Sequence, residues 1–465
     1  MKQPFKKALL ATAVALTCGA ATAGTVSVTK QVHSSEGLTG VTATQTSNAL
    51  SYTLGATYQE GDKITFTFPA DTLDKTNPES GFEGVVNIPE QNAGTANARA
   101  GLTLGLLNST VGDSADTVTY RVTTVTEVAT EVAGVTTGNT VGQVFSLTSG
   151  IPYSAAALLS RALTVTVNSE TAAGDTLDNS GTRTGTLAEA KSQFGSVAVA
   201  GFDAVIDVAQ MRKAFLGAAS DSMEWTITNP STTGWLNLAT VNATSGTVVT
   251  LKGEAGKFTD LSASNFAAGN LHGKAGTDVV DEANATVTVT YGGLTTNDTL
   301  TFTPTTGANA VVLEAQSFVS DFAYNYTSAA AQAGMATVGS NVPSGEWDLN
   351  GATVNIPYMP YGPTASQVIY VTNAGSQAGD ISVTAFDNTG KTFDLGVIGT
   401  ANANTVTKVA PLVNDALRAA GFSGRQASIT ITVNAPEDDI TVHASFNIGG
   451  NDRAFIITDQ YKGKE

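Results

Sequence analysis

The 465-residue sequence has almost no cysteine: the only thiol, Cys18, lies close to the amino terminus. Beyond it the chain can form no disulfide, so each domain must be held by its hydrophobic core, by metal or by neighbouring protein. A cysteine nucleophile is excluded for the same stretch. Lipidation of Cys18 is disfavoured, because Thr17 stands where a lipoprotein signal has a small residue.

Basic residues are also scarce. The chain has 23 Lys and Arg against 40 Asp and Glu, which gives a formal net charge of −17 at pH 7. Nucleic-acid binding needs a basic face, as does electrostatic docking onto anionic lipid, so we expect neither partner. The acidic balance instead suits an external protein that recruits divalent cations.

Long apolar runs are missing after the amino terminus, so no membrane insertion is predicted. At the amino terminus, three lysines precede the apolar run Ala8–Leu16, and Ala21-Thr22-Ala23 forms a small-x-small cleavage site before Gly24. This layout predicts a secretory signal peptide over residues 1–23. The three lysines leave with it, so the secreted chain would carry 20 basic and 40 acidic side chains.

Catalytic signatures are missing as well. The three histidines, His33, His272 and His443, lie far apart in the sequence. There is no H-E-x-x-H, G-x-S-x-G, Walker or G-x-G-x-x-G pattern. Two carboxylates placed by the fold would suffice for a glycosidase. However, the loops are small and polar and the chain has only three Trp, which disfavours a sugar-cleaving cleft. We therefore expect no enzyme activity.

What the sequence does contain is alternation of Val, Ile, Leu or Phe with Thr, which is typical of half-buried strands. The clearest runs are residues 64–68, 163–167, 286–291, 299–303 and 429–433. Such runs, bounded by Gly, Asn and Asp, predict a mainly β chain of two or three consecutive antiparallel β-sandwich domains with a few short helices. The Thr faces would be polar but uncharged, and could meet water or another subunit at little desolvation cost.

The predicted organisation follows from small, polar stretches at Asn179–Gly195 and Ser328–Gly345. It consists of the signal peptide, an N-terminal β-sandwich over 24–200, a middle β-rich domain over 201–335 and a C-terminal β-sandwich with one helix over 345–465. That helix is predicted over 406–420, with Pro near its start and Gly after its end. Shorter helices are predicted over 203–217 and 155–160.

Four acidic groups at strand ends are candidate metal sites, because calcium takes several carboxylate and carbonyl oxygens. None has the twelve-residue EF-hand spacing, and each can instead be a solvated turn, since Asp and Asn populate turns in any β protein. Calcium is the expected cofactor of at least one group. The candidates are Asp71, Asp74 and Glu79, near Asn77; Asp175 and Asp178, before Asn179; Asp278, Asp281 and Glu282; and Asp438 and Asp439, after Glu437.

The last quarter of the chain carries a family resemblance in six short strand-like motifs. They are NIPYMPY at 355–361, IYVTN at 369–373, GDISVTAFD at 379–387, FDLG at 393–396, ITITVNAP at 429–436 and FNIGGNDR at 446–453. In these motifs the segment resembles the C-terminal part of secreted surface-layer (S-layer) proteins of marine gammaproteobacteria. The rest of the chain is similar in character only, being acidic, strand-rich and poor in cysteine.

The resemblance implies a structural subunit that self-assembles into a two-dimensional layer on the outer cell surface. It also implies that calcium supports folding or lattice order, and it supplies no catalytic residue. Outer-membrane lipopolysaccharide is the expected further partner. The alternative is a secreted adhesin or fibre subunit that binds carbohydrate or a host surface. A lattice protein would form regular arrays when pure, whereas an adhesin would stay monomeric and bind its ligand.

Overall fold

The structure is a computed structural model. It describes residues 24–465 apart from 74–78, 80, 94, 96–97, 112–113, 129–137, 179–180, 259–276, 450–451 and 462–465, and it describes no side chain for Thr277, Asp278, Asp452 and Tyr461. The chain divides into two compact units. Unit 1 comprises Met1–Gly195, Asn229–Asn242 and Asn325–Ala336, and unit 2 comprises Ser196–Thr228, Ala243–Tyr324 and Thr337–Glu465. The predicted division into three domains stays a prediction.

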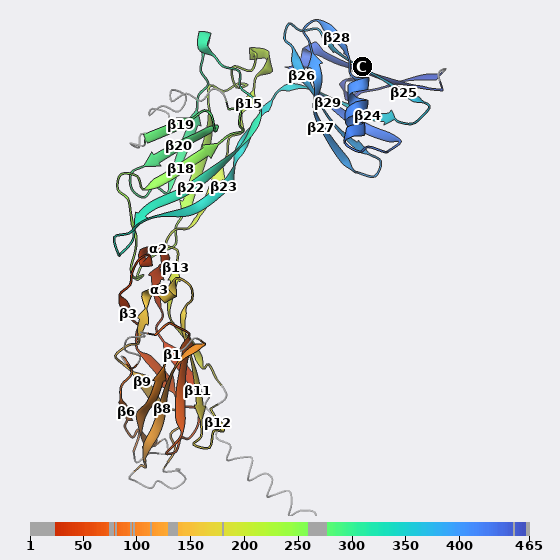
Figure 1. Ribbon diagram of the computed structural model, residues 1–465. Helices are drawn as coiled ribbons and strands as arrows, with labels where there is room; N and C mark the ends of the chain where they lie inside the picture. Colours follow the sequence, from red (N-terminus) through yellow and green to blue (C-terminus); the bar gives the residue numbers. More distant parts are fainter. Residues whose placement is uncertain are drawn as a thin grey trace, which may run out of the picture. The chain divides into compact units, whose positions relative to one another are not determined.

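Unit 1 is built on two facing sheets (Figure 1). The smaller has the order β1 (Thr25–Val28), β4 (Leu50–Thr53), β9 (Val144–Leu147). The larger has the order β2 (Gln31–Ser34), β13 (Thr184–Lys191), β11 (Leu163–Glu170), β5 (Lys63–Pro69), β8 (Ala115–Thr126), β7 (Gly101–Thr110), β6 (Val85–Ile88), and β12 (Thr176–Leu177) pairs with β11. The other elements that lie wholly within unit 1 are β3 (Thr44–Thr46), β10 (Pro152–Ser154), β17 (Thr240–Val241), α2 (Ser35–Leu38) and α3 (Ala155–Leu158).

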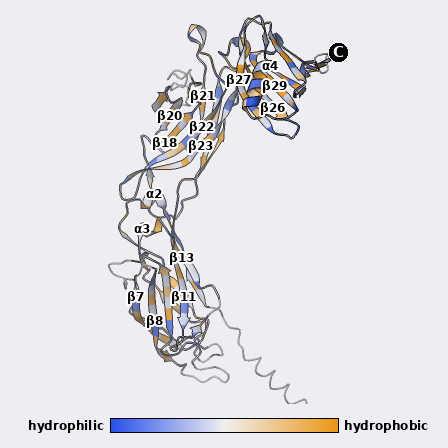
Figure 2. Ribbon diagram, turned by 45° about the vertical axis from the view of Figure 1, so that its right-hand side comes forward, coloured by the Kyte–Doolittle hydropathy of each residue, from blue (hydrophilic) through white to orange (hydrophobic). Residues whose placement is uncertain are grey.

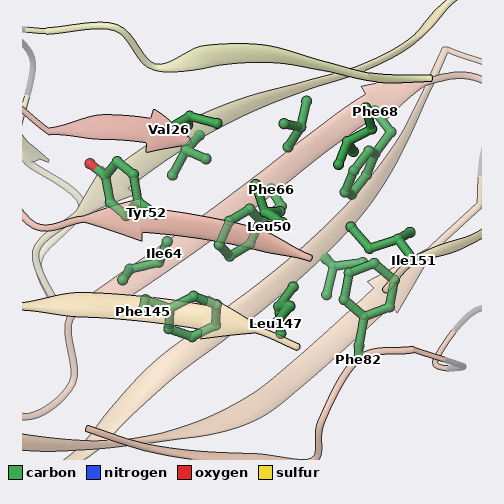
Figure 3. Close-up of a cluster of buried hydrophobic side chains, with 14 of the residues drawn as sticks. Val26, Leu50, Tyr52, Ile64, Phe66, Phe68, Phe82, Phe145, Leu147 and Ile151 are labelled. Atoms are coloured by element: carbon green, nitrogen blue, oxygen red, sulfur yellow. The ribbon is translucent and has the colours of Figure 1, made fainter. Parts of the chain in front are cut away.

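The core of unit 1 follows directly from the alternation in the sequence. Along β5, Ile64, Phe66 and Phe68 are buried while the intervening threonines face outward. Figure 3 shows these side chains meeting those of β4 and β9, and the rings of Phe66 and Phe145 lie 5.3 Å apart. Figure 2 shows the same alternation of hydrophobic and hydrophilic residues along β8 and β11. Burial of one face of each strand therefore sets the register of both sheets.

Unit 2 begins with two further sheets. One has the order β14 (Ser196–Ala200), β16 (Asp221–Thr228), β21 (Asn297–Phe302). The other has the order β15 (Val205–Ile206), β23 (Ala333–Leu349), β22 (Gln316–Thr327), β18 (Thr247–Lys252), β20 (Thr286–Tyr291), β19 (Thr277–Asp281), and β17 (Thr240–Val241) pairs with β22. Strands β22 and β23 contribute residues to both units. Short 3₁₀ turns occur at η1 (Val208–Gln210) and η2 (Gly307–Asn309).

An aromatic cluster around Trp347 forms the core of this part of unit 2. The Trp347 ring lies 4.8 Å from both Phe302 and Phe318, and 5.1 Å from Phe215. The indole Nε1 donates a hydrogen bond of 2.8 Å to the buried carboxylate of Asp221. Large apolar area is thus buried with its polar atom satisfied.

The C-terminal part of unit 2 is a sandwich of two four-stranded sheets with one helix. The first sheet has the order β24 (Gly351–Pro360), β29 (Gln426–Pro436), β26 (Gly379–Asp387), β27 (Thr392–Ala401). The second has the order β28 (Thr405–Lys408), β25 (Ala365–Asn373), β30 (Ile440–Ile448), β31 (Asp452–Ile456). Helix α4 (Ala410–Ala419) buries Val413 and Leu417 in the shared core, and η3 (Glu437–Asp439) and η4 (Asp459–Tyr461) are short turns.

The predicted fold class is confirmed, because the described chain is mostly β and its packed sheets are antiparallel apart from the pairs β2–β13 and β15–β23. All five quoted alternating runs lie in strands, except that Thr303 follows the end of β21. The helical predictions were less accurate. The helix predicted over 406–420 begins only at Ala410, since residues 405–408 are strand β28, and the helix predicted over 203–217 is wrong apart from the turn at η1. Residues 155–158 are helical as predicted. Within the described residues, no helix is both long enough and apolar enough to cross a membrane.

Candidate interaction surfaces

Threonine ladders cover the outer face of the large sheet in unit 1. Five threonines stand opposite one another across five adjacent strands, in the order Thr184, Thr166, Thr67, Thr117, Thr110. All five are at least partly exposed. In the next row, Thr65 and Thr119 share a hydrogen bond of 3.1 Å between their hydroxyls. These two rows present uncharged hydroxyl groups, as the alternation predicted, and the same face ends in the charged side chains of Lys63, Arg121 and Glu170.

The first sheet of the C-terminal sandwich has the same kind of outer face. Thr353, Thr432 and Ser382 are consecutive cross-strand partners, and the hydroxyls of Thr353 and Thr432 lie 3.3 Å apart. The neighbouring Asn355 donates from Nδ2 to the Thr430 hydroxyl at 3.1 Å. The same face also exposes two hydrophobic side chains, Phe386 at 49% and Val397 at 64%.

The second sheet of the C-terminal sandwich differs from both. We call its outer side the C-terminal face and define it by Tyr370, Val406, Lys408, His443, Arg453 and Phe455. Tyr370 stands opposite His443 and Lys408 in the ladder, and the rings of His443 and Phe455 lie 5.5 Å apart. Among the described outward positions of these four strands there is no Asp or Glu. The face is thus aromatic and basic in a chain that is acidic overall.

The two most exposed large hydrophobic side chains of the described chain, Phe455 and Ile457, lie at the edge of this face. Phe455 is 77% exposed, Ile457, which follows β31, is 69% exposed, and Val406 on the opposite edge strand is 63% exposed. Between the strands runs a groove of about 410 Å³ whose lining includes Tyr370, His443, Arg453 and Phe455. Exposed apolar side chains gathered in this way mark an interaction site more often than single ones do.

The first acidic group is only partly described. Asp71 has a positive φ of 60° and donates its amide to the buried carboxylate of Asp116. Asp74 lies outside the described residues. The carbonyl of Glu79 accepts a hydrogen bond of 3.0 Å from the Phe82 amide, which closes a turn. The sequence analysis missed Asp116, whose position inside a strand gave no sign that it would receive three backbone amides.

The second group is divided by burial. Asp175 is exposed, and its amide donates to the Thr171 hydroxyl at 3.0 Å. Asp178 is only 9% exposed, and both its oxygens accept hydrogen bonds: Oδ1 from the Gly24 amide, and Oδ2 from the Tyr52 hydroxyl and the Gly55 amide. The structure therefore does not place Asp175 and Asp178 in one cluster.

The other two groups close turns. The side chain of Asp278 lies outside the described residues. Asp281 accepts from the amide and from Nδ2 of Asn284, and these hydrogen bonds hold the pKa of its carboxyl below the ordinary value. Glu282 is exposed, and its carbonyl accepts from the Ala285 amide.

Residues Asp438 and Asp439 lie in the η3 turn, where Asp438 is exposed and the Asp439 carbonyl accepts from Ala374. Across the described chain, no three His, Cys, Asp or Glu residues are grouped so that they could hold a metal ion. The calcium sites stay a prediction.

Comparisons with known proteins give one informative result. A family model described as "S-layer protein Slr4" matches residues 62–453. No curated protein matches the sequence. Among solved structures, the type II cohesin dyad from the adaptor ScaA scaffoldin of Acetivibrio cellulolyticus is 9% identical, with 70% of this chain and 95% of that chain covered. Its TM-score is 0.17, so this similarity supports no conclusion about the fold or function of this chain. The family model spans well over half of the chain, and the chain therefore belongs to the S-layer protein Slr4 family, a family of structural rather than enzymatic proteins.

Proposed function

We propose that this protein is a subunit that self-assembles into a two-dimensional layer on the outer cell surface, and that the C-terminal face is one of its contacts with the next copy. Family membership supports a surface-layer structural protein. The main support for this contact is the difference between the outer faces of the sheets. The other two outer faces carry rows of hydroxyls together with carboxylates such as Glu170 and Asp380, whereas the C-terminal face exposes Phe455, Val406 and Arg453 with no carboxylate at its described outward positions.

The hydrophobic side chains favour burial against protein. Covering a side chain of the size of Phe455 contributes about 1.5–3 kcal/mol, and Val406 and Ile457 would add to this. Phe455 offers a ring on which a sugar can stack, but the aliphatic Val406 and Ile457 offer little to a sugar and pack well against another protein surface. A second copy therefore fits the face better than a carbohydrate does.

Charge favours the same partner. A mature copy of this chain would have 40 acidic against 20 basic residues, so its surface is predominantly anionic. Lys408 and Arg453 on the C-terminal face are exposed, and no carboxylate accompanies them at the described outward positions. Contact between this face and a different, acidic patch of the next copy is head-to-tail. Contacts of this kind continue from copy to copy and close into the rings from which layers are built.

The proposal extends to two partners. Calcium would bridge or screen the acidic surfaces of neighbouring copies, and the support for it is the large excess of carboxylates. Lipopolysaccharide would anchor the layer to the outer membrane, and cosedimentation with lipopolysaccharide vesicles tests that anchor. The proposed contact through the C-terminal face requires neither calcium nor lipopolysaccharide.

The test is electron microscopy of the purified mature protein together with two variants. Phe455→Ser removes the most exposed ring of the C-terminal face. Phe386→Ser is the matched control, because Phe386 is also an exposed phenylalanine, 49% accessible, but lies on β26 of the other sheet. We expect ordered arrays from the parent protein and from Phe386→Ser, and dispersed subunits from Phe455→Ser with an unchanged circular dichroism spectrum.

Arrays from Phe455→Ser as regular as those of the parent would contradict the contact. Monomers from all three proteins would contradict self-assembly itself. If the monomers then bound glycans and lost that binding with Phe455→Ser, the adhesin alternative would be favoured.

A further inference from the structure

The start of the described chain is buried against an aspartate that lies 154 positions away. The amide nitrogen of Gly24 lies 2.8 Å from Asp178 Oδ1. The other oxygen of Asp178 accepts from the Tyr52 hydroxyl at 2.6 Å and from the Gly55 amide at 2.7 Å. Both Gly24 and Asp178 are buried. Three donors from three separate segments of unit 1 thus converge on one carboxylate.

Strand β1 delivers Gly24 to this carboxylate. Its residues Thr25 and Val26 pair with Thr53 and Tyr52 of β4, and the Val26 amide donates to the Thr182 carbonyl at 2.8 Å. Figure 3 shows Tyr52 at the border of the core, with its hydroxyl oxygen directed away from the surrounding hydrocarbon side chains. Burial and the adjoining Asp178 carboxylate raise the pKa of Tyr52, so its hydroxyl stays a donor.

Only glycine fits at position 24. A Cβ on Gly24 would collide with Oδ2 of Asp178 and with the hydroxyl of Tyr52. The backbone nitrogen of Gly24, directly before β1, can therefore approach the carboxylate closely only because the residue has no side chain. This constraint applies to the residue that directly follows the Ala21-Thr22-Ala23 cleavage site.

We propose that signal-peptide cleavage between Ala23 and Gly24 creates a buried ion pair between the new amino-terminal ammonium and Asp178. In this step the Ala23–Gly24 peptide bond is hydrolysed by the cell's signal peptidase. Water supplies the hydroxyl that ends residue 23 as a carboxylate, and the Gly24 nitrogen becomes an amine. Since a free α-amine has a pKa of about 8, it is protonated at neutral pH.

The two states of the nitrogen differ in charge and in donor number. In the precursor, Gly24 offers one neutral N–H, and none of the ion pairs among the described side chains includes Asp178. After cleavage it offers three N–H donors and a full positive charge. Charge-assisted hydrogen bonds are about twice as strong as neutral ones, and a buried charge that lacks its counter-ion destabilises the fold. Processing would thereby complete the fold of unit 1 around β1.

The experiment compares two full-length mature chains that differ by one residue. One begins at Gly24, and the other keeps Ala23 before it, so its ammonium is displaced by one residue and an amide occupies the site. We expect the Gly24 form to melt about 5 °C or more above the Ala23 form at pH 7. We also expect slower amide hydrogen exchange in β1 and β4. Both differences should shrink above pH 10, where the amine is neutral.

The substitution Asp178→Asn, made in both chains, completes a double-mutant cycle. It keeps the size of the side chain and removes its charge, so the difference between the two chains should vanish. If Asp178→Asn does not fold, labelling of the amino terminus by an amine-reactive reagent is measured instead. The buried amine of the Gly24 form should react more slowly than the amine of the Ala23 form. Equal melting temperatures, a difference that survives Asp178→Asn, or an exported protein whose amino terminus by mass spectrometry is not Gly24 would each overturn the proposal. None of these results bears on lattice assembly.

Discussion

The imidazole of His33 meets the ring of Tyr153 edge-on, with 2.7 Å between His33 Nε2 and the Tyr153 hydroxyl oxygen. His33 is fully buried in unit 1. Its other nitrogen, Nδ1, lies 2.9 Å from Asn237 Nδ2, which also donates to Gln45 Oε1. Because Asn237 Nδ2 is a donor, His33 Nδ1 must accept, so the ring is neutral and carries its proton on Nε2.

This arrangement predicts a loss of stability on mild acidification. Burial lowers the pKa of His33 below 6.5. The unfolded chain takes up the proton near the ordinary pKa, whereas the folded chain takes it up only at lower pH, so the free energy of unfolding falls as the pH drops below about 6.5. Urea denaturation between pH 7.5 and 5 measures the slope. His33→Gln should flatten it, and the exposed His443→Gln should leave it unchanged. Equal slopes in all three proteins would exclude His33 as the cause.

A second prediction concerns the buried carboxylate of Asp116. It accepts from the amides of Asp71, Thr72 and Leu73 at 3.2, 2.8 and 2.9 Å. Asp116→Ala leaves these amides without that acceptor and should lower the free energy of unfolding by about 3 kcal/mol. The exposed Asp175→Ala should change it by about 0.5 kcal/mol or less. Urea titration followed by circular dichroism compares them, and similar small losses would show that the Asp116 contacts are unimportant.

A third prediction concerns salt. The large negative net charge separates copies at low ionic strength, and the Debye length shrinks from about 30 Å at 0.01 M to about 8 Å at 0.15 M. Assembly should therefore fail in low salt with a chelator and return on addition of calcium. Sodium chloride at matched ionic strength separates screening from a specific calcium requirement. Arrays formed in low salt with chelator would contradict both the need for charge screening and the need for calcium.

A fourth prediction uses two glycines with positive φ. Gly345 has φ 94° and Gly217 has φ 71°. A Cβ on Gly345 would collide with the backbone of Phe202, whereas one on Gly217 would meet nothing within 4 Å. Gly345→Ala should therefore destabilise by about 2–4 kcal/mol, and Gly217→Ala by about 1 kcal/mol. Fluorescence of the neighbouring Trp347 during denaturation reports the difference. Equal losses of stability from the two substitutions would mean that the strain of a positive φ determines the effect and that the collision with Phe202 adds nothing.

The strands were predictable because alternation is a local signal. Ile429–Val433 reads as a strand from five residues, and burial of one face enforces it. The helix expected over 203–217 failed because tertiary packing outweighed propensity. Ile206 and Phe215 are both buried and form a β-bridge, and Met211 and Arg212 adopt positive φ between them. The first helical turn expected from Val406 was lost because residues 405–408 pair with β25 instead.

The candidate sites were less predictable than the strands. Acidic side chains could be found in the sequence, but Asp178 and Asp175 are three positions apart and have unlike surroundings. The contact of Asp178 with Gly24 joins distant parts of the chain and depends on pairing between β1 and β4. The C-terminal face has a faint sequence signal, since Phe455 and Arg453 stand at outward positions where other strands carry Thr.

The position of Gly24 also bears on how such a chain leaves the cell. A polypeptide that crosses a membrane through a narrow channel must be threaded in extended form, and a firmly folded precursor would stall there. With the leader attached, the Gly24 nitrogen is an uncharged amide, so its hydrogen bond to Asp178 is neutral and unit 1 lacks the proposed ion pair while the chain is still inside. Removal of the leader would supply the positive charge on the far side. Signal-peptide cleavage would then both release the protein from its leader and stabilise its folded state.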